Sequence, residues 1–400
     1  MTKHLGAATM PDFFSKRYNS KALKLVSALI IFVFLVPYSA SVYKGLSGIF
    51  SMAFGIDFKY CIIGMAVLTC IYVVLGGYMA AAANNFVQGI VMLGGIVAVV
   101  FAVLNGKGGF TEAVKALSQV EVAEGAVGEG MKGAYTSLFG PDPLSLLGVM
   151  ILTSLGTWGL PQMIHKFYTI DSEKSITKGA VISTIFAFVV AGGSYFIGGF
   201  GRLYVQSGEG GMPSVAYDEI MPNMLEGVLP DILMGLVVVL VLSASMSTLS
   251  SLVISSASTL TVDFFKGFIK KDMKDNQQMI FTRAFCVLFM AISVVLALFP
   301  GTLITNLMAI SWGALSGAFL APFMYGLYSK RITNASVWVS FIAGIGFIVL
   351  NMFMKFMSGT SAGAVSMLIT LVLVPVVSMI TKKPDKEHAE KCFSCYNKVD

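Results

Sequence analysis

The chain has 400 residues, of which 56% are hydrophobic and only 12% are charged. Soluble domains carry about twice that share of charged residues, so the composition excludes an ordinary soluble protein. The net charge of +6 is expected to reflect basic loops at an anionic lipid surface. We therefore expect the lipid bilayer as a partner and no nucleic acid.

Ten apolar segments are long enough to cross a bilayer, which takes roughly 20 residues. Two charge-free stretches are of double length and are predicted to break at turn sequences, "GGYMAAAANN" from Gly76 and "FPGT" around Pro300. The predicted helices are 24–46, 57–77, 84–106, 143–166, 178–200, 229–260, 280–299, 303–328, 333–354 and 361–381. The sequence thus predicts an all-α, polytopic membrane protein with about ten transmembrane helices.

The distribution of Lys and Arg predicts which loops face the cytoplasm. If the N-terminus is cytoplasmic and the helices alternate, 20 of the 27 Lys and Arg residues lie in inside segments. The other seven are Lys44, Lys59, Lys107, Lys115, Lys132, Arg202 and Lys355. We therefore expect a multi-pass plasma-membrane protein with both termini in the cytoplasm, residues 1–381 forming the membrane domain and residues 382–400 a cytoplasmic tail.

The segments outside the spans offer little chemistry. The long loop 107–142 has a possible short helix in "FTEAVKAL", and the loop 201–228 carries several acidic residues. In the tail, Cys392, Cys395 and His388 supply half of the ligands of a metal knuckle. We favour a solvated tail over a metal or redox role for these residues.

Enzyme motifs are absent from the sequence: there is no phosphate-binding loop, no metal-ligand cluster and no nucleophile with a plausible base. The three histidines, His4, His165 and His388, lie away from the middle of any span. Charged residues are also absent from helix centres, where each costs about 2.5–3.5 kcal/mol. We expect no enzyme activity, no catalytic residue and no cofactor, and a ligand inside the membrane held by uncharged oxygens.

The predicted helix 229–260 carries small and hydroxyl residues along one side. At helical spacing the stripe consists of Ala244, Ser247, Thr248, Ser251, Ser255 and Ser258. A second, apolar stripe on a largely opposite side consists of Leu242, Leu249, Val253 and Leu260. One interpretation is close helix packing through small residues. The other is a cation site, in which oxygens of Ser247, Thr248 and the Ala244 carbonyl converge on a monovalent ion.

Two further stretches are irregular. "LGTWGLPQMIHKF" places Gly156, Gly159 and Pro161 inside the predicted span 143–166, where they form either a simple kink or a break beside a cavity. "ISWGALSGAFLAP" places Trp312 and two glycines in the middle of a helix, where they allow close packing or a flat-walled pocket.

Five stretches, in order along the chain, resemble motifs of the sodium:solute symporter family, which includes proline, pantothenate, monocarboxylate and sugar carriers. They are "TMPDFFSKRY" (Thr9–Tyr18), "YVVLGGYMAAAANNFVQGIVM", "GLPQMIHKFYTIDSEKSI", "SASMSTLSSLVISSASTLTVDFFK" and "SWGALSGAFLAPFMYGLYSKR". The resemblance covers essentially the whole chain. It implies a five-plus-five inverted-repeat fold with flanking helices, and Na⁺ as the coupling ion for the uptake of a small organic solute.

The resemblance also implies functional positions. Ala244 (through its carbonyl), Ser247 and Thr248 stand where the family draws ligands for its common sodium site. Ser250 and Ser251 stand near a second sodium site that only some members use. The candidate substrate-binding residues are Tyr38, Thr153, Thr157, Trp158, Pro161 and Trp312.

The sequence departs from the family pattern in three places. The family normally has three helices before the Thr9–Tyr18 loop, so we expect these helices to be missing here. Asn85 occupies a position where many members carry an aspartate of the second sodium site, and we therefore expect one sodium ion. Thr153 and Thr157 replace aromatic residues expected of proline carriers, and "GLPQ" is nearer to the pantothenate and monocarboxylate carriers.

Sodium-coupled uptake of an amino acid, pantothenate or monocarboxylate is the favoured function. The alternatives are a non-transporting membrane sensor or scaffold, and an inactive truncated fragment. The tail after Lys382 is too short for a signalling module, which argues against the sensor.

Overall fold

The computed structural model describes residues 1–167, 170, 172–299 and 301–396, with side chains for all of these except 75–84, 167, 173 and 209. Within these ranges the regular structure is helical, and the β-type pairing found is one isolated bridge. The α-helices longer than seven residues are α1 (Met10–Tyr18), α2 (Lys21–Phe54), α3 (Phe58–Asn105), α4 (Phe110–Ser118), α5 (Pro143–Ser154), α7 (Glu173–Phe186), α8 (Gly192–Phe200), α9 (Ile220–Val228), α10 (Asp231–Thr259), α11 (Asp275–Leu298), α12 (Ile304–Tyr328), α13 (Asn334–Met354), α14 (Gly359–Ile380) and α15 (Lys386–Phe393). The prediction of an all-α protein is confirmed.

Eight helical stretches in the described ranges are long and apolar enough to cross a membrane, and one of them is Asn85–Asn105, the second part of α3. Two shorter apolar stretches accompany them, Phe58–Val74 at the start of α3 and Pro143–Ser154, which is α5. This agrees with the ten predicted spans. The predicted break at Gly76 is wrong, because α3 continues as one helix from Phe58 to Asn105; the alanines that follow the two glycines favour helix. The second double-length stretch does divide, because α11 ends at Leu298 and α12 begins at Ile304.

The loops contain more helix than the sequence predicts. The short helix expected in "FTEAVKAL" is α4, but α9 and α1 were not predicted. The segment 10–18 forms α1 because Thr9 accepts a hydrogen bond from the Asp12 amide at 3.2 Å and a proline occupies the first turn. Asn19 then ends the helix in the left-handed conformation.

The chain forms two compact units, which are described separately. Unit 1 consists of Met1–Ser41, Leu147–Ile170 and Ser251–Asp400, and unit 2 of Val42–Leu146 and Asp171–Ser250. Three helices pass from one unit to the other along the chain: α2, α5 and α10.

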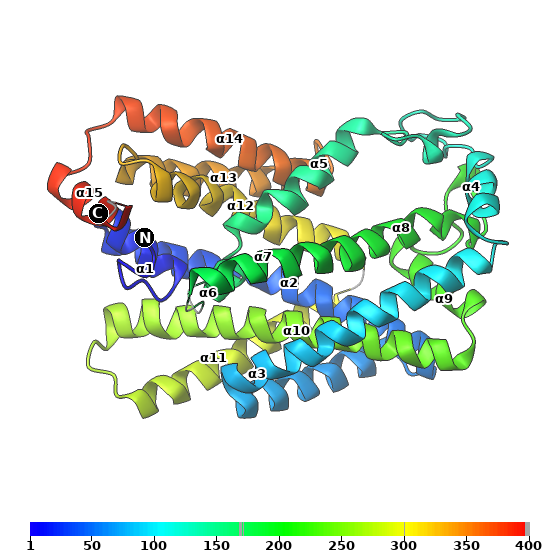
Figure 1. The fold of residues 1–400 in the computed structure, drawn as a ribbon, viewed down its shortest axis with the longest axis horizontal. Helices are drawn as coiled ribbons and strands as arrows, with labels where there is room; N and C mark the ends of the chain where they lie inside the picture. Colours follow the sequence, from blue (N-terminus) through cyan, green and yellow to red (C-terminus); the bar gives the residue numbers. More distant parts are fainter. Residues whose placement is uncertain (168–169, 171, 300, 397–400) are drawn as a thin grey trace. The chain divides into compact units, whose positions relative to one another are not determined.

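The core of unit 1 is the bundle of α12, α13 and α14, which run side by side (Figure 1). Small residues allow the helices to approach closely, as is typical of membrane bundles. A Cβ on Gly344 of α13 would lie 2.4 Å from the backbone carbon of Gly317 in α12. Serines join the helices: the Ser366 hydroxyl donates to the Gly344 carbonyl at 2.9 Å, and that of Ser340 to the Ala318 carbonyl at 2.8 Å.

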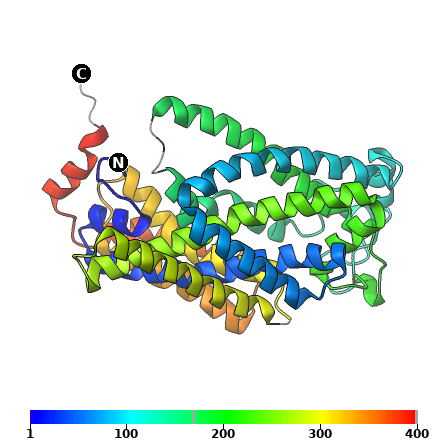
Figure 2. The same cartoon turned by 90° about the horizontal axis from the view of Figure 1, so that it is seen from below.

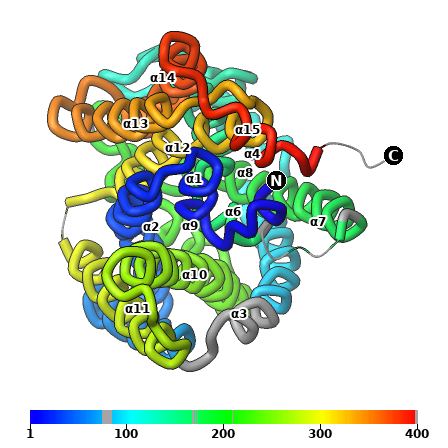
Figure 3. Tube along the Cα trace, turned by 90° about the vertical axis from the view of Figure 1, so that its left-hand side faces the viewer, coloured from blue at the N-terminus to red at the C-terminus, as the bar shows by residue number. Residues whose placement is uncertain are grey.

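Helix α1 packs across the end of α12 within unit 1 (Figure 3). Phe13 meets Phe323 edge to face with ring centroids 5.1 Å apart. The Arg17 side chain is fully buried and donates to the carbonyls of Gly326 and Ser329, which lie near the C-terminus of α12. A cation is favourable there because the last carbonyls of a helix lack partners within it.

A buried ion-pair network joins α1, α2 and the π-helix that follows α10 (Leu260–Ile269). Lys24 Nζ lies 2.9 Å from Asp12 Oδ1 and 3.1 Å from Asp263 Oδ1. Asp263 is completely buried and also accepts a hydrogen bond from the Thr9 hydroxyl at 2.7 Å. Burial raises the pKa of Asp12, but hydrogen bonds and charges from Lys16 and Lys24 outweigh it and hold that pKa below its usual value.

The described part of the tail is docked as well as solvated: most of residues 382–396 are exposed, as predicted, but Ala389, Cys392 and Phe393 are buried. Helix α15 lies beside the N-terminal segment within unit 1 (Figure 2). The Phe393 ring is buried and faces the guanidinium of Arg17 at 5.0 Å. Nε2 of His388 hydrogen-bonds the Lys16 carbonyl at 3.0 Å. The Arg17 guanidinium and the Lys16 carbonyl of α1 thus hold a segment whose charge alone would predict full exposure to solvent.

Cys392 and Cys395 are free thiols, and no group of three or more metal ligands occurs among the described residues. The Cys392 sulfur lies 3.6 Å from Nε2 of His388. Burial raises the pKa of the Cys392 thiol, which disfavours the thiolate that a metal requires. Cys392 therefore serves as a packing residue of α15.

The core of unit 2 gathers where the shorter helices α4 and α9 meet the ends of α3 and α8. Met224 of α9 and Val103 of α3 are among its most buried residues. The Tyr204 hydroxyl donates to the Val103 carbonyl at 2.5 Å, and the ammonium group of Lys107 lies 4.4 Å from the Tyr204 ring centre. The two long loops are thus ordered by apolar packing against the helix ends.

Candidate functional site

The predicted span 143–166 is a broken helix and not a simply kinked one. α5 ends at Ser154, a 3-10 turn covers Gly156–Gly159, and a short helix, α6 (Pro161–Phe167), follows. Leu160 between them is extended, with φ −88° and ψ 116°. Proline disfavours the helical conformation in the residue before it, so Pro161 explains where the helix stops.

The broken segment packs closely against α12 in unit 1. A Cβ on Gly159 would lie 2.6 Å from the Cα of Ser316, so a larger residue cannot occupy this position without displacing backbone. The Ser316 hydroxyl donates to the Gly156 carbonyl at 2.7 Å. A carbonyl freed by the break is thereby satisfied from the neighbouring helix, as a membrane interior requires.

The candidate substrate residues all lie in unit 1, but only some of them meet. Tyr38 of α2 and Trp312 of α12 contact edge to face, with ring centroids 5.8 Å apart. Thr153 and Thr157 instead bond within their own turns, to the carbonyls of Val149 and Ser154 at 2.8 and 2.9 Å. Trp158 remains 46% exposed.

The glycines beside Trp312 serve packing rather than a flat-walled pocket. A Cβ on Gly313 would lie 2.9 Å from the Cα of Gly363 in α14. A Cβ on Gly317 would lie 2.1 Å from the hydroxyl oxygen of Ser366. Helix α12 is therefore held against its neighbours on this face, and Trp312 is directed toward Tyr38.

Gln162, which follows Pro161 directly, was missed by the sequence interpretation. It is only 3% exposed, and neither its amide nitrogen nor its amide oxygen has a hydrogen-bond partner within the described part of the chain. The Ser311 hydroxyl, next to Trp312, is also buried without a partner there. Leaving such a group unpaired costs about 1–3 kcal/mol, so each needs a functional or structural reason. The sequence signal was a polar residue placed immediately after a break in a span.

The predicted sodium ligands lie on α10. The Thr248 hydroxyl donates to the Ala244 carbonyl at 3.0 Å, which brings two of the three predicted ligand oxygens together. The Ser250 hydroxyl donates to the Ser247 carbonyl at 3.0 Å. Ser247 and Thr248 are half-buried, and Ser247 also has a further interaction.

The opposite stripe of α10 faces protein. Leu249 and Val253 are completely buried, so this part of the apolar stripe packs against protein. The hydroxyl of Ser256, outside the predicted stripe, is buried without a hydrogen-bond partner among the described residues.

The residues of the candidate second sodium site lie on two helices, α3 and α10. Asn85 lies on α3, and its amide oxygen is buried and without a hydrogen-bond partner within the described ranges. Ser250 bonds within its own helix, and Ser251, the next residue, belongs to the other compact unit.

A family model described as the sodium:solute symporter family matches residues 2–344. The chain belongs to the sodium:solute symporter family. Known relatives of this symporter include the osmoregulated proline transporter OpuE of Bacillus subtilis, 26% identical over 95% of the chain and 75% of the relative. A sodium/proline symporter of Staphylococcus aureus is 29% identical over 94% of the chain and 74% of the relative. The chain thus spans about three quarters of the length of these relatives.

Solved structures support the same fold. A Na⁺-coupled sialic acid symporter in a substrate-bound, outward-open state matches 96% of this symporter chain and 79% of its own, with a TM-score of 0.75 at 16% identity. A nucleobase-cation-symport-1 family transporter in a closed conformation, with bromovinylhydantoin bound, matches with a TM-score of 0.50 at 16% identity. The chain is a multi-pass membrane protein with the fold of the inverted-repeat sodium symporters.

Proposed function

We propose that this symporter couples the entry of Na⁺ to the uptake of a small organic solute such as an amino acid, pantothenate or a monocarboxylate. It acts in the plasma membrane, with both termini in the cytoplasm. The relatives named as proline carriers support an amino acid of that size. The single observation that carries the proposal is Gln162, whose amide is buried and unpaired beside a helix break, where a solute would supply the missing hydrogen bonds.

In this proposal α10 supplies part of the sodium site. The Ala244 carbonyl and the Ser247 and Thr248 hydroxyls are neutral oxygens, which suit a hard cation that must bind and then leave. The hydrogen bond from Thr248 to Ala244 supports this assignment, because it places two such oxygens 3.0 Å apart. Asn85, Ser250 and Ser251 give less support to a second site, and we propose one sodium ion per cycle.

One sodium ion provides enough free energy to concentrate a scarce nutrient. Its entry releases about 2.3 kcal/mol per 100 mV of membrane potential and about 1.4 kcal/mol for a tenfold concentration gradient. Together these drive accumulation of roughly 400- to 600-fold. Tyr38 and Trp312 would contact the apolar part of the solute, and the broken segment from Thr153 to Pro161 its polar part.

Ser247→Ala and Thr248→Ala are each expected to raise the sodium concentration for half-maximal uptake by about tenfold, because each removes one oxygen that contacts the ion. The measurement is solute uptake into proteoliposomes over a range of external sodium concentrations. Ser258→Ala is the matched control, because its hydroxyl also bonds within the helix, to the Ser255 carbonyl. Unchanged sodium dependence in both site variants would remove α10 from the coupling mechanism.

Gln162→Leu is expected to abolish solute uptake while leaving the free energy of unfolding unchanged or raising it by about 1 kcal/mol. The leucine fills a similar volume and removes two polar atoms that have no partner in the described structure. Thermal unfolding in detergent and uptake are measured on the same preparation. A less stable variant that still transports would show that Gln162 is a structural residue.

A further inference from the structure

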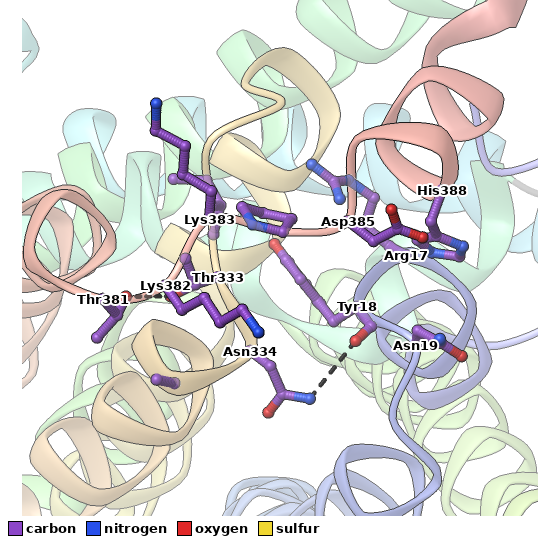
Figure 4. Close-up of a pocket in the computed structure, with 13 residues that line it drawn as sticks. Arg17, Tyr18, Asn19, Thr333, Asn334, Thr381, Lys382, Lys383, Asp385 and His388 are labelled. Carbon is purple, nitrogen blue, oxygen red and sulfur yellow. Dashed lines mark hydrogen bonds between the residues drawn. The ribbon is translucent and has the colours of Figure 1, made fainter.

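A cavity of about 330 Å³ opens at one end of unit 1 (Figure 4). Three segments that are distant in sequence form its walls. They are the end of α1 with the residue after it (17–19), the start of α13 with the residue pair before it (332–335), and the chain between α14 and α15 (381–385) together with His388 of α15. None of these segments belongs to the broken helix or to the sodium-binding stretch of α10.

The charges around the cavity are mostly positive. Arg17, Lys382 and Lys383 line it, against one carboxylate, that of Asp385. Arg17 is only 1% exposed, yet its hydrogen-bond acceptors are neutral carbonyls. Among the described residues no ion pair joins any of these three cations to a carboxylate. A buried guanidinium of this kind is favourable beside an anion, because charge that is removed from water needs a partner.

The start of α13 adds hydrogen-bond donors. Thr333 caps the helix by accepting from the Ser336 amide, and the residues that follow it, Asn334 and Ala335, line the cavity. The first amides of a helix have no acceptor within it and carry the positive end of the helix dipole. In Figure 4 the Lys382 side chain extends across the cavity toward Asn334, whereas that of Lys383 extends away from it.

The cavity adjoins a surface suited to acyl chains. α14 ends at Ile380, one residue before the cavity wall begins at Thr381. Val376, Met379 and Ile380, in its last turns, are 47%, 71% and 80% exposed, as lipid-facing residues are. The cations therefore lie where a spanning helix leaves the hydrocarbon, at the depth of lipid headgroups.

We propose that this cavity binds a phosphate group, with Arg17, Lys382 and the first amides of α13 as its donors. The exposed apolar turn beside it favours the phosphate of an anionic lipid headgroup as the source, and free inorganic phosphate is the other source of the same chemistry. The bound anion would bridge α1, α13 and the segment before α15, and so stabilise the docked tail helix.

The test uses the full-length protein, purified in a neutral detergent with lipid removed. Its thermal unfolding temperature is measured with added phosphatidylglycerol, with phosphatidylcholine and with inorganic phosphate. The wild-type protein is expected to gain stability from phosphatidylglycerol but not from phosphatidylcholine. The variant Lys382→Gln/Lys383→Gln is expected to need roughly thirtyfold more phosphatidylglycerol for the same gain, because each of the two basic residues near an anionic surface is associated with about 1 kcal/mol.

Lys270→Gln/Lys271→Gln is the matched control. It removes the same charge from two exposed, adjacent lysines of unit 1 that do not line the cavity. If inorganic phosphate stabilises the wild-type protein and only Lys382→Gln/Lys383→Gln loses this effect, the site is supported and its ligand is a soluble anion. Stabilisation by phosphatidylglycerol alone, lost in the same way, would support the site and assign lipid. Equal losses in both double variants, or no stabilisation by either anion, would overturn the proposal.

Discussion

Replacing Lys24 with methionine is expected to lower the free energy of unfolding by about 3 to 5 kcal/mol. The Lys24 ammonium lies within 3.1 Å of two carboxylates, those of Asp12 and Asp263. Methionine has a similar length but no charge, so the fully buried Asp263 would be left with only the Thr9 hydroxyl as a partner, and it would have either to bury an unpaired charge or to take up a proton. Removing one partner of a buried pair costs far more than the pair itself contributes, because the remaining charge stays out of water.

Lys16→Met is the control for this prediction. Lys16 also contacts Asp12, at 2.8 Å, but its side chain is 40% exposed, and exposed ion pairs contribute about 0–1 kcal/mol. The double variant Lys24→Met/Asp263→Asn is expected to recover much of the loss, because it removes both buried charges. The stability of the wild-type protein and of the three variants is measured by unfolding each purified protein with heat or denaturant. Equal losses for Lys16→Met and Lys24→Met, or no recovery in the double variant, would contradict the network as described.

Gly344→Ala is expected to destabilise the protein by about 3 kcal/mol, the upper part of the range for an added methyl group in a tightly packed core. The new Cβ would lie 2.4 Å from the Gly317 carbon and 2.7 Å from the Ala318 nitrogen. Both are backbone atoms of α12, so no side chain can turn aside, and the two helices have to separate. The separation would also stretch the hydrogen bond from Ser340 of α13 to the Ala318 carbonyl of α12.

Gly346→Ala, two residues further along α13, is the matched control. No atom lies within 4 Å of the Cβ that this change adds. It is therefore expected to be neutral or to stabilise by up to about 1 kcal/mol, since alanine favours helix over glycine. The thermal unfolding temperature of both variants in the same detergent provides the comparison. Similar unfolding temperatures for the two would show that α12 and α13 do not cross as closely as described.

The membrane-spanning helices were predictable because long apolar runs are easily recognised in a sequence. Lipid requires long apolar helices, and stretches such as 303–328 and 333–354 are nearly the observed α12 and α13. What the sequence did not reveal are the short elements that dock by specific contacts. α15 has few apolar residues, and only its packing of Phe393 on Arg17 shows why it is ordered. α1 was visible as a motif, but its role as a cap on the end of α12 depends on long-range hydrogen bonds.

For the candidate site, the sequence located the helix break correctly, since proline has a direct effect on the residue before it. It also placed Thr248 within reach of the Ala244 carbonyl, because the i, i+4 spacing determines that contact. It did not identify Gln162, because the sequence alone does not show whether a glutamine amide has hydrogen-bond partners in the folded chain. Burial and the absence of a hydrogen-bond partner in the described structure are properties of the packed chain alone.

The close crossing of α12 with α13 has a consequence for movement in unit 1. Helices that meet backbone to backbone at Gly317 and Gly344 cannot slide past each other without a collision, so the α12–α14 bundle behaves as a rigid body. Residues 155–160 differ, because the extended Leu160 interrupts the regular helical ladder. Gly156 and Gly159 nevertheless lie against Ser316 of α12, so a change in the direction of α6 would have to break the hydrogen bond from Ser316 to the Gly156 carbonyl, and the α12–α14 bundle is the frame to which this stretch is tied.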